Sequence, residues 1–512
     1  MNDERTEKQA DDAGLSHQSL DIDEAMMRAL SDKSAALVAD YFANVAKLPV
    51  FPDRASTEAL AAIRDAAIPG EGQDLERIFD DLRTLISGSR HNGHPRFFGY
   101  VASPSTPVGA YADLLASALN ANVTSWRSAP AATEVEKTVV RWMAELVGYG
   151  SDTGGLLTSG GSMANLTALL ISHRAAAPLD VSIKGLSAMD SPMTVYASEQ
   201  VHLSIPKAAD VLGLGREQVR MVAVDEMFRM DVRLLRESIE SDLRRGLKPF
   251  CIVASAGTVN TGAVDPLDEV ARVSQGYGLW FHVDGAYGAF GALDAERSHL
   301  FRGMERADSL SLDAHKWLYA PVDCGCLLFR DTEKARAALS TVEADYIKVH
   351  EEEEREAFAF WDYGIELSRR FRALKLWMMM RYYGVRRLSE AVMHDNALAE
   401  YLAQMVRESE DFELLAPVCL SICCFRYVPE EMRLRLEGAQ DKEEREARER
   451  ELDEINMRIM QSVQRGGRAY VSNATLRGRF SLRACITNFR TTRADLRQTL
   501  EIIREAARAL SH

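Results

Sequence analysis

The sequence predicts an α/β fold with a mostly parallel central sheet, a helical N-terminal segment and a small C-terminal α+β domain. Short β-rich runs alternate with helical stretches through the middle of the chain, at 194–197, 250–254, 279–283 and 326–329. Strands that alternate with helices favour a parallel sheet covered on both faces. A chain of 512 residues can also bury a large core without disulfides or structural metals.

The two ends of the chain differ in pattern from this middle part. Residues 1–20 are rich in charged and amide side chains, which indicates a disordered tail. Helical patterns dominate residues 21–100, with few strand signals. We expect a large ligand-binding domain at 101–385 and a small domain at 386–512.

Residues 133–147 have the pattern of an amphipathic helix, and Thr133 with Glu136 has the spacing of a capping box. Near the C-terminus, β-rich runs occur at 418–427 and 479–486. Between them, 430–465 is dense in acid–base pairs four residues apart, which is typical of a solvated surface helix. Its later part carries a predicted buried stripe of Leu452, Ile455, Ile459 and Val463.

Composition excludes several classes of function. The net charge of −15 argues against a nucleic-acid partner, since phosphate binding needs a basic surface. No run of about 18 apolar residues predicts a membrane span, and the first twenty residues lack the apolar segment of a signal peptide. The seven cysteines do not have disulfide or zinc spacing, so we expect core thiols, no metal and a cytoplasmic protein.

A glycine-rich turn at 158–165 leads into an apolar helical stretch. Such a turn exposes backbone N–H groups to an anion, and the helix dipole favours negative charge there. The Ser162 hydroxyl could add a further donor. An ordinary helix start remains the alternative, because paired glycines often precede helices.

Three further residues occupy positions suited to chemistry. Asp284 follows an apolar run, so it is expected at the carboxyl edge of the sheet, where it could hold a pyridinium nitrogen protonated. Lys316 lies among apolar neighbours, and desolvation makes a lysine nucleophilic. His202 follows a predicted strand and could stack on a flat ring. Taken singly, a turn aspartate, a surface lysine and a structural histidine remain the alternatives.

In this order, the motifs resemble those of the group II pyridoxal-dependent amino-acid decarboxylases, which include aromatic-L-amino-acid, glutamate, diaminobutyrate and tyrosine decarboxylases. The resemblance extends from about His94 to the C-terminus. The segments that carry it are 94–100, 125–130, 158–165, 196–204, 256–262, 282–286, 313–317 and 369–377.

The resemblance implies the pyridoxal-5′-phosphate (PLP) transferase fold type I and a homodimer with active sites at the subunit interface. It assigns the Schiff base with PLP to Lys316, the pyridine nitrogen to Asp284 and the ring face to His202. Ala286 is expected beneath the ring, and Thr258 near its phenolic oxygen or the substrate carboxylate. The residues expected to hold the phosphate are Gly161, Ser162 and His315.

The function implied by the resemblance is decarboxylation of an L-amino acid to an amine and CO2. Tyr346, in the 344–348 motif, matches a loop tyrosine that supplies a proton in the family. Aldehyde-forming relatives carry phenylalanine there, so Tyr346 favours decarboxylation, although an ordinary loop tyrosine remains the alternative. Aldehyde synthesis, transamination and a non-catalytic role are the competing hypotheses.

The substrate is less clearly indicated. Aromatic-type relatives usually have phenylalanines at the positions of Val101 and Thr124, so these two residues weaken the case for an aromatic pocket. An aromatic substrate is one expectation and an acidic one such as glutamate is another. Arg127 could admit an acidic side chain, or lie at the surface. Arg483 matches an arginine that reaches the α-carboxylate in glutamate-type relatives. The candidate substrate-binding residues are Tyr100, Thr124, Arg127 and Arg483.

Overall fold

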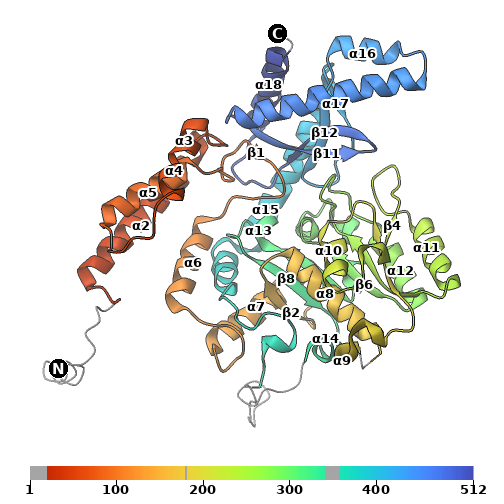
Figure 1. Ribbon diagram of the computed structural model, residues 1–512, viewed down its shortest axis with the longest axis horizontal. Coiled ribbons are helices and arrows are strands. Elements are labelled where there is room, and N and C mark those ends of the chain that lie inside the picture. The colour runs from red at the N-terminus through yellow and green to blue at the C-terminus, as the bar shows by residue number, and fades with distance from the viewer. Residues whose placement is uncertain (1–19, 179–180, 341–356, 511–512) are drawn as a thin grey trace. The chain divides into compact units, whose positions relative to one another are not determined.

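The computed structural model describes residues 20–178, 181–340 and 357–510 (Figure 1). Residues 1–19 of the expected tail lie outside this part of the chain. The chain divides into two compact units, one comprising residues up to Leu48 with Arg54–Ser89 and the other comprising Pro49–Asp53 with Arg90–His512.

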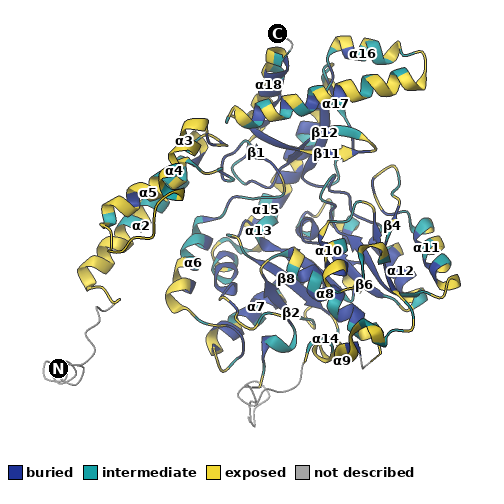
Figure 2. Cartoon of the chain, viewed as in Figure 1, coloured by how far each residue is buried: buried dark blue, intermediate teal, exposed yellow. Residues whose placement is uncertain are grey.

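The first unit is helical. Asp23 caps its longest helix by accepting a hydrogen bond from the Met26 N–H, and an ion pair joins Lys33 to Glu76 on a second helix. The longest helix, α2, has no buried residue along its described length (Figure 2). The elements are α2 (Glu24–Asn44), η1 (Val45–Lys47), α3 (Arg54–Ala59), α4 (Ala61–Arg64) and α5 (Leu75–Ser87).

The second unit is built on a seven-stranded sheet with the order β2-β8-β7-β6-β5-β3-β4. Strands β4, β3, β5, β6 and β7 pair in parallel, whereas β8 is antiparallel to both β7 and β2. The predicted α/β class with a mostly parallel sheet is confirmed. The strands are β2 (Gly154–Thr158), β3 (Met193–Ser198), β4 (Val219–Val222), β5 (Lys248–Ser255), β6 (Trp280–Asp284), β7 (Ser309–Asp313) and β8 (Gly325–Phe329).

The four predicted β-rich runs lie in β3, β5, β6 and β8, but β2, β4 and β7 were not predicted. In β7 the reason is chemical. Ser309 and Ser311 are fully buried and form hydrogen bonds with His282 and Asp284, so the strand lacks the continuous apolar run expected of a buried strand.

Helices cover the sheet and bury one continuous apolar core (Figure 2). Helix α8 packs on β5, β7 and β8, whereas α11 and α12 pack on β5. The helices of this part are α6 (Pro107–Leu119), α7 (Pro130–Leu146), α8 (Gly161–Ala176), α9 (Val181–Lys184), α10 (Ser204–Val211), α11 (Val232–Arg244), α12 (Leu267–Tyr277), α13 (Ala314–Trp317) and α14 (Thr332–Leu339).

Helix α7 begins at Pro130, so the expected start at Thr133 and its capping box are wrong. Proline suits the first helical turn, and it moves the helix start three residues upstream. Thr133 then lies inside the helix and donates to the Ser125 carbonyl. Glu136 is fully buried and forms an ion pair with Arg369.

A five-stranded sheet, β1-β11-β12-β10-β9, carries its own apolar cluster. The long α15 precedes the last four strands of this sheet and leaves helical conformation at Gly384, where φ is 72°, next to the domain boundary proposed at 385. The predicted charged surface helix is two helices, and Leu452, Ile459 and Val463 are buried. The elements are β1 (Phe97–Phe98), α15 (Ala373–Glu408), β9 (Phe412–Leu414), β10 (Ile422–Tyr427), α16 (Glu430–Glu437), α17 (Lys442–Arg465), β11 (Tyr470–Leu476), β12 (Arg479–Cys485) and α18 (Arg493–Leu510).

All seven cysteines are free thiols, and six of them are buried. Within the described ranges, no helix is long and apolar enough to cross a membrane.

Candidate active site

The carboxyl ends of five strands of the large sheet meet at one edge. β2 is parallel to β7 because both are antiparallel to β8, and β3, β5, β6 and β7 are parallel to one another. A cavity of about 560 Å³ opens at this edge, as ligand sites of α/β sheets do. Ten of the predicted residues line it: Tyr100, Gly161, Ser162, His202, Thr258, Asp284, Ala286, His315, Lys316 and Arg483.

Lys316 lies on the single-turn helix α13 directly after β7. Its Nζ is 2.9 Å from Asp313 Oδ2, and the Lys316 side chain is 20% exposed. The next residue, Trp317, is fully buried and its indole N–H donates to Asp395 at 3.1 Å. The buried tryptophan therefore anchors the turn that presents the lysine to the cavity.

His315 and the start of α8 form an anion-binding corner. The Cys324 N–H donates to His315 Nδ1 at 3.1 Å, and burial lowers the pKa of His315. The imidazole is therefore neutral and carries its proton on Nε2. The first N–H groups of a helix have no acceptor within the helix, so Gly161 and Ser162 offer further donors. A Cβ on Gly161 would approach the Ala286 Cβ to 2.7 Å, so glycine permits this close approach.

Three donors orient the carboxylate of Asp284. The Asn165 amide donates to Oδ2 at 2.9 Å, while the Ser311 hydroxyl and the Ala286 N–H donate to Oδ1 at 3.2 and 3.1 Å. Nearby, burial lowers the pKa of His202, although the charge of Asp284 opposes this effect. The carboxylate and a neutral imidazole thus face the same cavity.

Arg483 comes from β12 of the second sheet and is only 3% exposed. Its Nη1 donates to the Tyr100 carbonyl at 2.7 Å and its Nε to the Val259 carbonyl at 2.9 Å. Within the described residues, Arg483 Nη2 has no hydrogen-bond partner, and neither does Asp313 Oδ1. Both residues line the cavity, so its walls include a guanidinium and a carboxylate that each have one buried atom without a partner among the described residues.

Thr124 and Arg127 are not among the residues that line this cavity, and Tyr346 lies outside the described residues. Asn165, Asp313, Ser472 and Asn473 line it but were not predicted. Asn165 and Asp313 belong to recognised motifs, which was a usable signal. Ser472 and Asn473 come from β11, a strand that the sequence pattern did not indicate.

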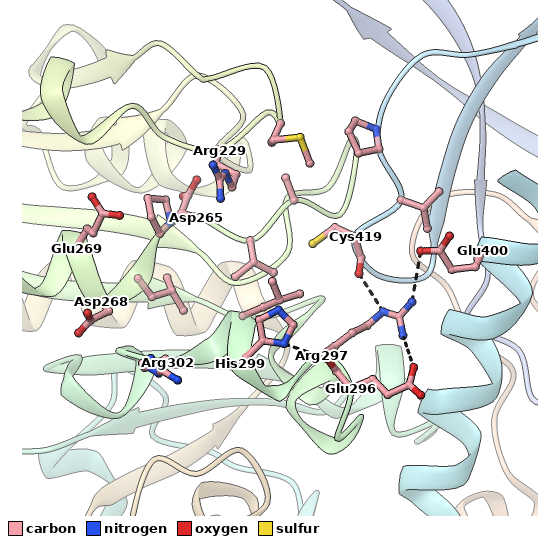
Figure 3. Close-up of a pocket in the computed structure, with 18 of the residues that line it drawn as sticks. Arg229, Asp265, Asp268, Glu269, Glu296, Arg297, His299, Arg302, Glu400 and Cys419 are labelled. Atoms are coloured by element: carbon pink, nitrogen blue, oxygen red, sulfur yellow. Dashed lines mark hydrogen bonds and ion pairs between the residues drawn. The ribbon is translucent and has the colours of Figure 1, made fainter. Parts of the chain in front are cut away.

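A second cavity of about 620 Å³ lies between the α12 region and α15 (Figure 3). Its central cation is Arg297, which pairs with Glu400 at 3.5 Å and donates to the Cys419 carbonyl at 3.1 Å. Arg272 pairs with Asp268 at 2.7 Å on the same wall. Because these charges are used within the protein, the second cavity is a weaker candidate for ligand binding.

A family model described as the pyridoxal-dependent decarboxylase conserved domain matches residues 58–428. The chain belongs to this family.

Individual relatives are similar to this protein over nearly the whole chain. An aromatic-L-amino-acid decarboxylase of Bacillus atrophaeus is 34% identical over 96% of this chain and 98% of the relative. A phenylacetaldehyde synthase of Arabidopsis thaliana is 30% identical over 96% and 98%. The crystal structure of Oryza sativa TDC with PLP and tryptamine superposes with a TM-score of 0.86 at 29% identity, covering 97% of this chain and 100% of that one.

The decarboxylase is thus a PLP-dependent carboxy-lyase of fold type I. Its sheet-edge cavity suits this cofactor chemically. The anion-binding corner at α8 matches a phosphate, Asp284 matches a protonated ring nitrogen, and Lys316 is the amine that can attach an aldehyde. The buried polar atoms of Asp313 and Arg483 that lack partners indicate a cavity built for a polar occupant.

Proposed function

We propose that this decarboxylase converts an L-amino acid to the corresponding amine and CO2, using Lys316 as its nucleophile. One observation carries the proposal. Lys316, the Asp284 carboxylate and the N-terminus of α8 all face a single cavity at the carboxyl edge of the sheet. These are the amine, the ring-nitrogen partner and the anion site that PLP chemistry needs.

We assign the cofactor contacts as follows. Gly161, Ser162 and His315 would hold the phosphate, and the Lys316 amine would bind the aldehyde group. When bound, PLP acts as an electron sink for the electron pair left behind by CO2. Asp284 would contact the ring nitrogen, His202 and Ala286 would contact the two faces of the ring, and Thr258 would lie near the phenolic oxygen.

Arg483 and Asp313 act on the substrate side of the reaction. The unused Nη2 of Arg483 is suited to the α-carboxylate, because a guanidinium N–H forms a charge-assisted hydrogen bond with a carboxylate oxygen. Asp313, whose Oδ2 is 2.9 Å from Lys316 Nζ, would hold the lysine side chain whenever it is not bound to the cofactor. The two residues therefore orient the substrate and stabilise the released lysine.

Tyr346 is the proposed proton donor to the carbon that loses CO2. The described chain resumes at 357 beside Thr124 and Trp126, where the Trp126 N–H donates to the Phe358 carbonyl and the Phe360 N–H to the Thr124 carbonyl. We propose that Thr124, Arg127 and Tyr346 act together at the cavity of a second subunit, since Thr124 and Arg127 do not line the cavity of their own chain.

A homodimer is part of this proposal. Helix α2 has no buried residue, yet it exposes Met26, Met27 and Leu30, and α5 exposes Ile78 and Leu82. Apolar side chains at this density on one helical unit are typical of a surface that is covered in the assembled protein. We propose that a second copy of the chain covers them.

The substrate class that we favour is aromatic. The relative from Bacillus atrophaeus acts on aromatic L-amino acids by its name, and Tyr100, half-exposed, lines the cavity with its hydroxyl 3.1 Å from that of Tyr470. An acidic substrate such as glutamate is the alternative if Arg127 reaches the partner's cavity. Aldehyde formation is the second candidate reaction, supported by the phenylacetaldehyde synthase relative and opposed by Tyr346.

The test is a panel of L-amino acids incubated with the purified protein and PLP. We expect one or a few aromatic members to release CO2 and amine in equal amounts. Aldehyde, ammonia and peroxide would identify the second candidate reaction, and a keto acid would identify transamination. A protein that binds PLP and releases CO2 from no member of the panel contradicts the proposed function.

The cytoplasmic localisation expected from the sequence stays a prediction. The free state of all seven cysteines is compatible with a reducing compartment.

A further inference from the structure

Asn165 lies at the centre of a buried hydrogen-bond network beneath the proposed ring site. Its Nδ2 donates to Asp284 Oδ2 and to Ser204 Oγ, both at 2.9 Å. Its Oδ1 is 3.0 Å from His282 Nε2. Asn165 is 1% exposed and His282 is fully buried, so each polar atom must find its partner within the protein.

At the far end of this network, Trp280 is a fixed donor. An indole N–H can only donate, and Trp280 Nε1 is 2.9 Å from Ser309 Oγ. Ser309 Oγ accepts from Trp280, which leaves the Ser309 proton free to donate to His282 Nδ1, 2.9 Å away. In that arrangement a neutral His282 carries its single ring proton on Nε2, from which it donates to the Asn165 carbonyl oxygen.

The near end of the network imposes the same direction independently. The Ser204 backbone N–H, which can only donate, points to His202 Nδ1 at 3.3 Å. His202 Nδ1 is therefore unprotonated, and the Ser204 hydroxyl, 2.8 Å away, can donate to it as well. Ser204 Oγ is left to accept from the Asn165 amide. The Asn165 amide then faces Ser204 Oγ and Asp284 Oδ2 while its oxygen faces His282 Nε2, so the near end selects the arrangement in which His282 donates from Nε2.

We define the buried relay as Trp280, Ser309, His282 and Asn165. We infer that the buried relay positions Asp284 and His202. The relay directs an amide N–H toward the Asp284 carboxylate and keeps the single ring proton of His202 on Nε2. The inference rests on the proposed function for the roles of Asp284 and His202. Residues of the relay are positioning residues, because they act through these two groups.

The reversed arrangement would be costly in this place. If the Asn165 amide were turned over, its oxygen would face Asp284 Oδ2 at 2.9 Å and its Nδ2 would face His282 Nε2. Two acceptors would then oppose each other in a buried region, where an unsatisfied polar group loses its full solvation. The relay removes this second state by making His282 a donor at Nε2. Burial also lowers the pKa of His282 to about 4, which keeps the ring neutral.

The first experiment observes the histidine tautomer directly. In the full-length protein with selectively 15N-labelled histidine, we expect the His282 resonances of a neutral ring protonated at Nε2 and unprotonated at Nδ1. The signals are assigned with the His282→Gln variant. They should be present with and without PLP and stay constant between about pH 6 and 8. A ring protonated at Nδ1 alone, or one that titrates in this range, overturns the inference.

The second experiment breaks the relay at its upstream end. Ser309→Ala removes the hydroxyl group that donates a hydrogen bond to His282 Nδ1. We therefore expect a fraction of the molecules to carry the other His282 tautomer, and the dissociation constant of PLP to rise about tenfold. Ser172→Ala is the matched control: Ser172 is equally buried, and its hydroxyl donates to the Leu169 carbonyl, outside the relay. We expect this control to retain wild-type tautomer and affinity.

A third variant keeps the test decisive if Ser309→Ala folds poorly. Asn165→Asp preserves the size of the side chain and the acceptor for His282 but replaces the donor to Asp284 with an oxygen. We expect it to weaken PLP binding by more than Ser309→Ala. Unchanged PLP affinity in both relay variants overturns the positioning role. Failure of the wild-type protein to bind PLP would instead contradict the proposed function, while the tautomer of His282 would still decide whether the relay exists.

Discussion

Two cavities of the second unit are similar in size but differ in their buried polar atoms. The cavity at the sheet edge, of about 560 Å³, contains buried polar atoms of Asp313 and Arg483 that lack partners in the described structure. The cavity beside α15, of about 620 Å³, is rich in charge, yet Arg297 and Arg272 are paired with acids (Figure 3). Volume alone would favour the cavity beside α15 over the one at the sheet edge.

The difference teaches that unused hydrogen-bonding capacity identifies a ligand site better than size does. An ion pair already formed within the protein has little left to offer a ligand, whereas a buried donor without a partner gains a full hydrogen bond on binding. The arrangement of strand ends points to the same cavity, because parallel strands bring their carboxyl ends to one edge.

The largest expected effect separates the two cavities at Lys316. Lys316→Ala should abolish the visible absorbance of lysine-linked PLP and lower kcat/KM by roughly ten-thousandfold, the scale seen when a covalent nucleophile is removed. Lys334→Ala, at an exposed lysine of α14, is the control and should behave as wild type. Retention of both absorbance and activity in Lys316→Ala would place the reaction elsewhere.

Tyr346→Phe tests whether the reaction assigned to the sheet-edge cavity also needs a residue outside the described part of the chain. We expect the amine yield to fall by roughly a hundredfold, the range of general acid catalysis, and aldehyde to appear among the products. The measurement is quantification of amine, aldehyde and CO2 from one substrate. An unchanged amine yield would remove Tyr346 from the mechanism.

Arginines from the two cavities provide a direct comparison. Arg483→Gln should raise KM by roughly tenfold to a hundredfold, because a charge-assisted hydrogen bond to the substrate carboxylate is lost. Arg302→Gln, at an exposed arginine that lines the second cavity, should leave KM unchanged. The reverse pattern would transfer substrate binding to the second cavity. Thermal unfolding of both variants shows whether the fold is kept.

The smallest expected effect concerns stability rather than either cavity. Burial lowers the pKa of His173, in the last turn of α8, from 6.5 to about 4, and neighbouring Arg174 adds to the shift. Between these two pH values His173 is protonated in the unfolded chain but neutral in the folded chain. Its contribution therefore makes the free energy of unfolding fall as the pH drops from about 6.5 to about 4.

His173→Gln should remove that contribution, which is on the order of 1–3 kcal/mol at the acid end. Denaturant unfolding at pH 7 and pH 5 measures it, and the variant should lose less stability between the two than wild type. PLP affinity should not change, since His173 is not among the residues lining the sheet-edge cavity. An equal loss in both proteins would show that His173 is not held neutral.

Local sequence pattern determined the α/β class, the strands with continuous apolar runs and the motifs around Lys316, Asp284 and the α8 turn. Each depends on neighbours within a few residues, so it can be recognised without the fold. Pattern failed where polar residues are buried for a tertiary reason, as in β7, whose serines bond to residues of β6. It also failed at α7, where Pro130 moved the helix start.

Only the tertiary structure decided which of the candidates share a cavity. It brought Arg483 from the second sheet to Lys316 and Asp284, and it left Thr124 and Arg127 outside that cavity. It also decided the proton arrangement between Trp280 and His202, which are separated by 78 positions in the chain. Hydrogen-bond direction depends on which donors face which acceptors in space, and that information exists only once the strands are paired.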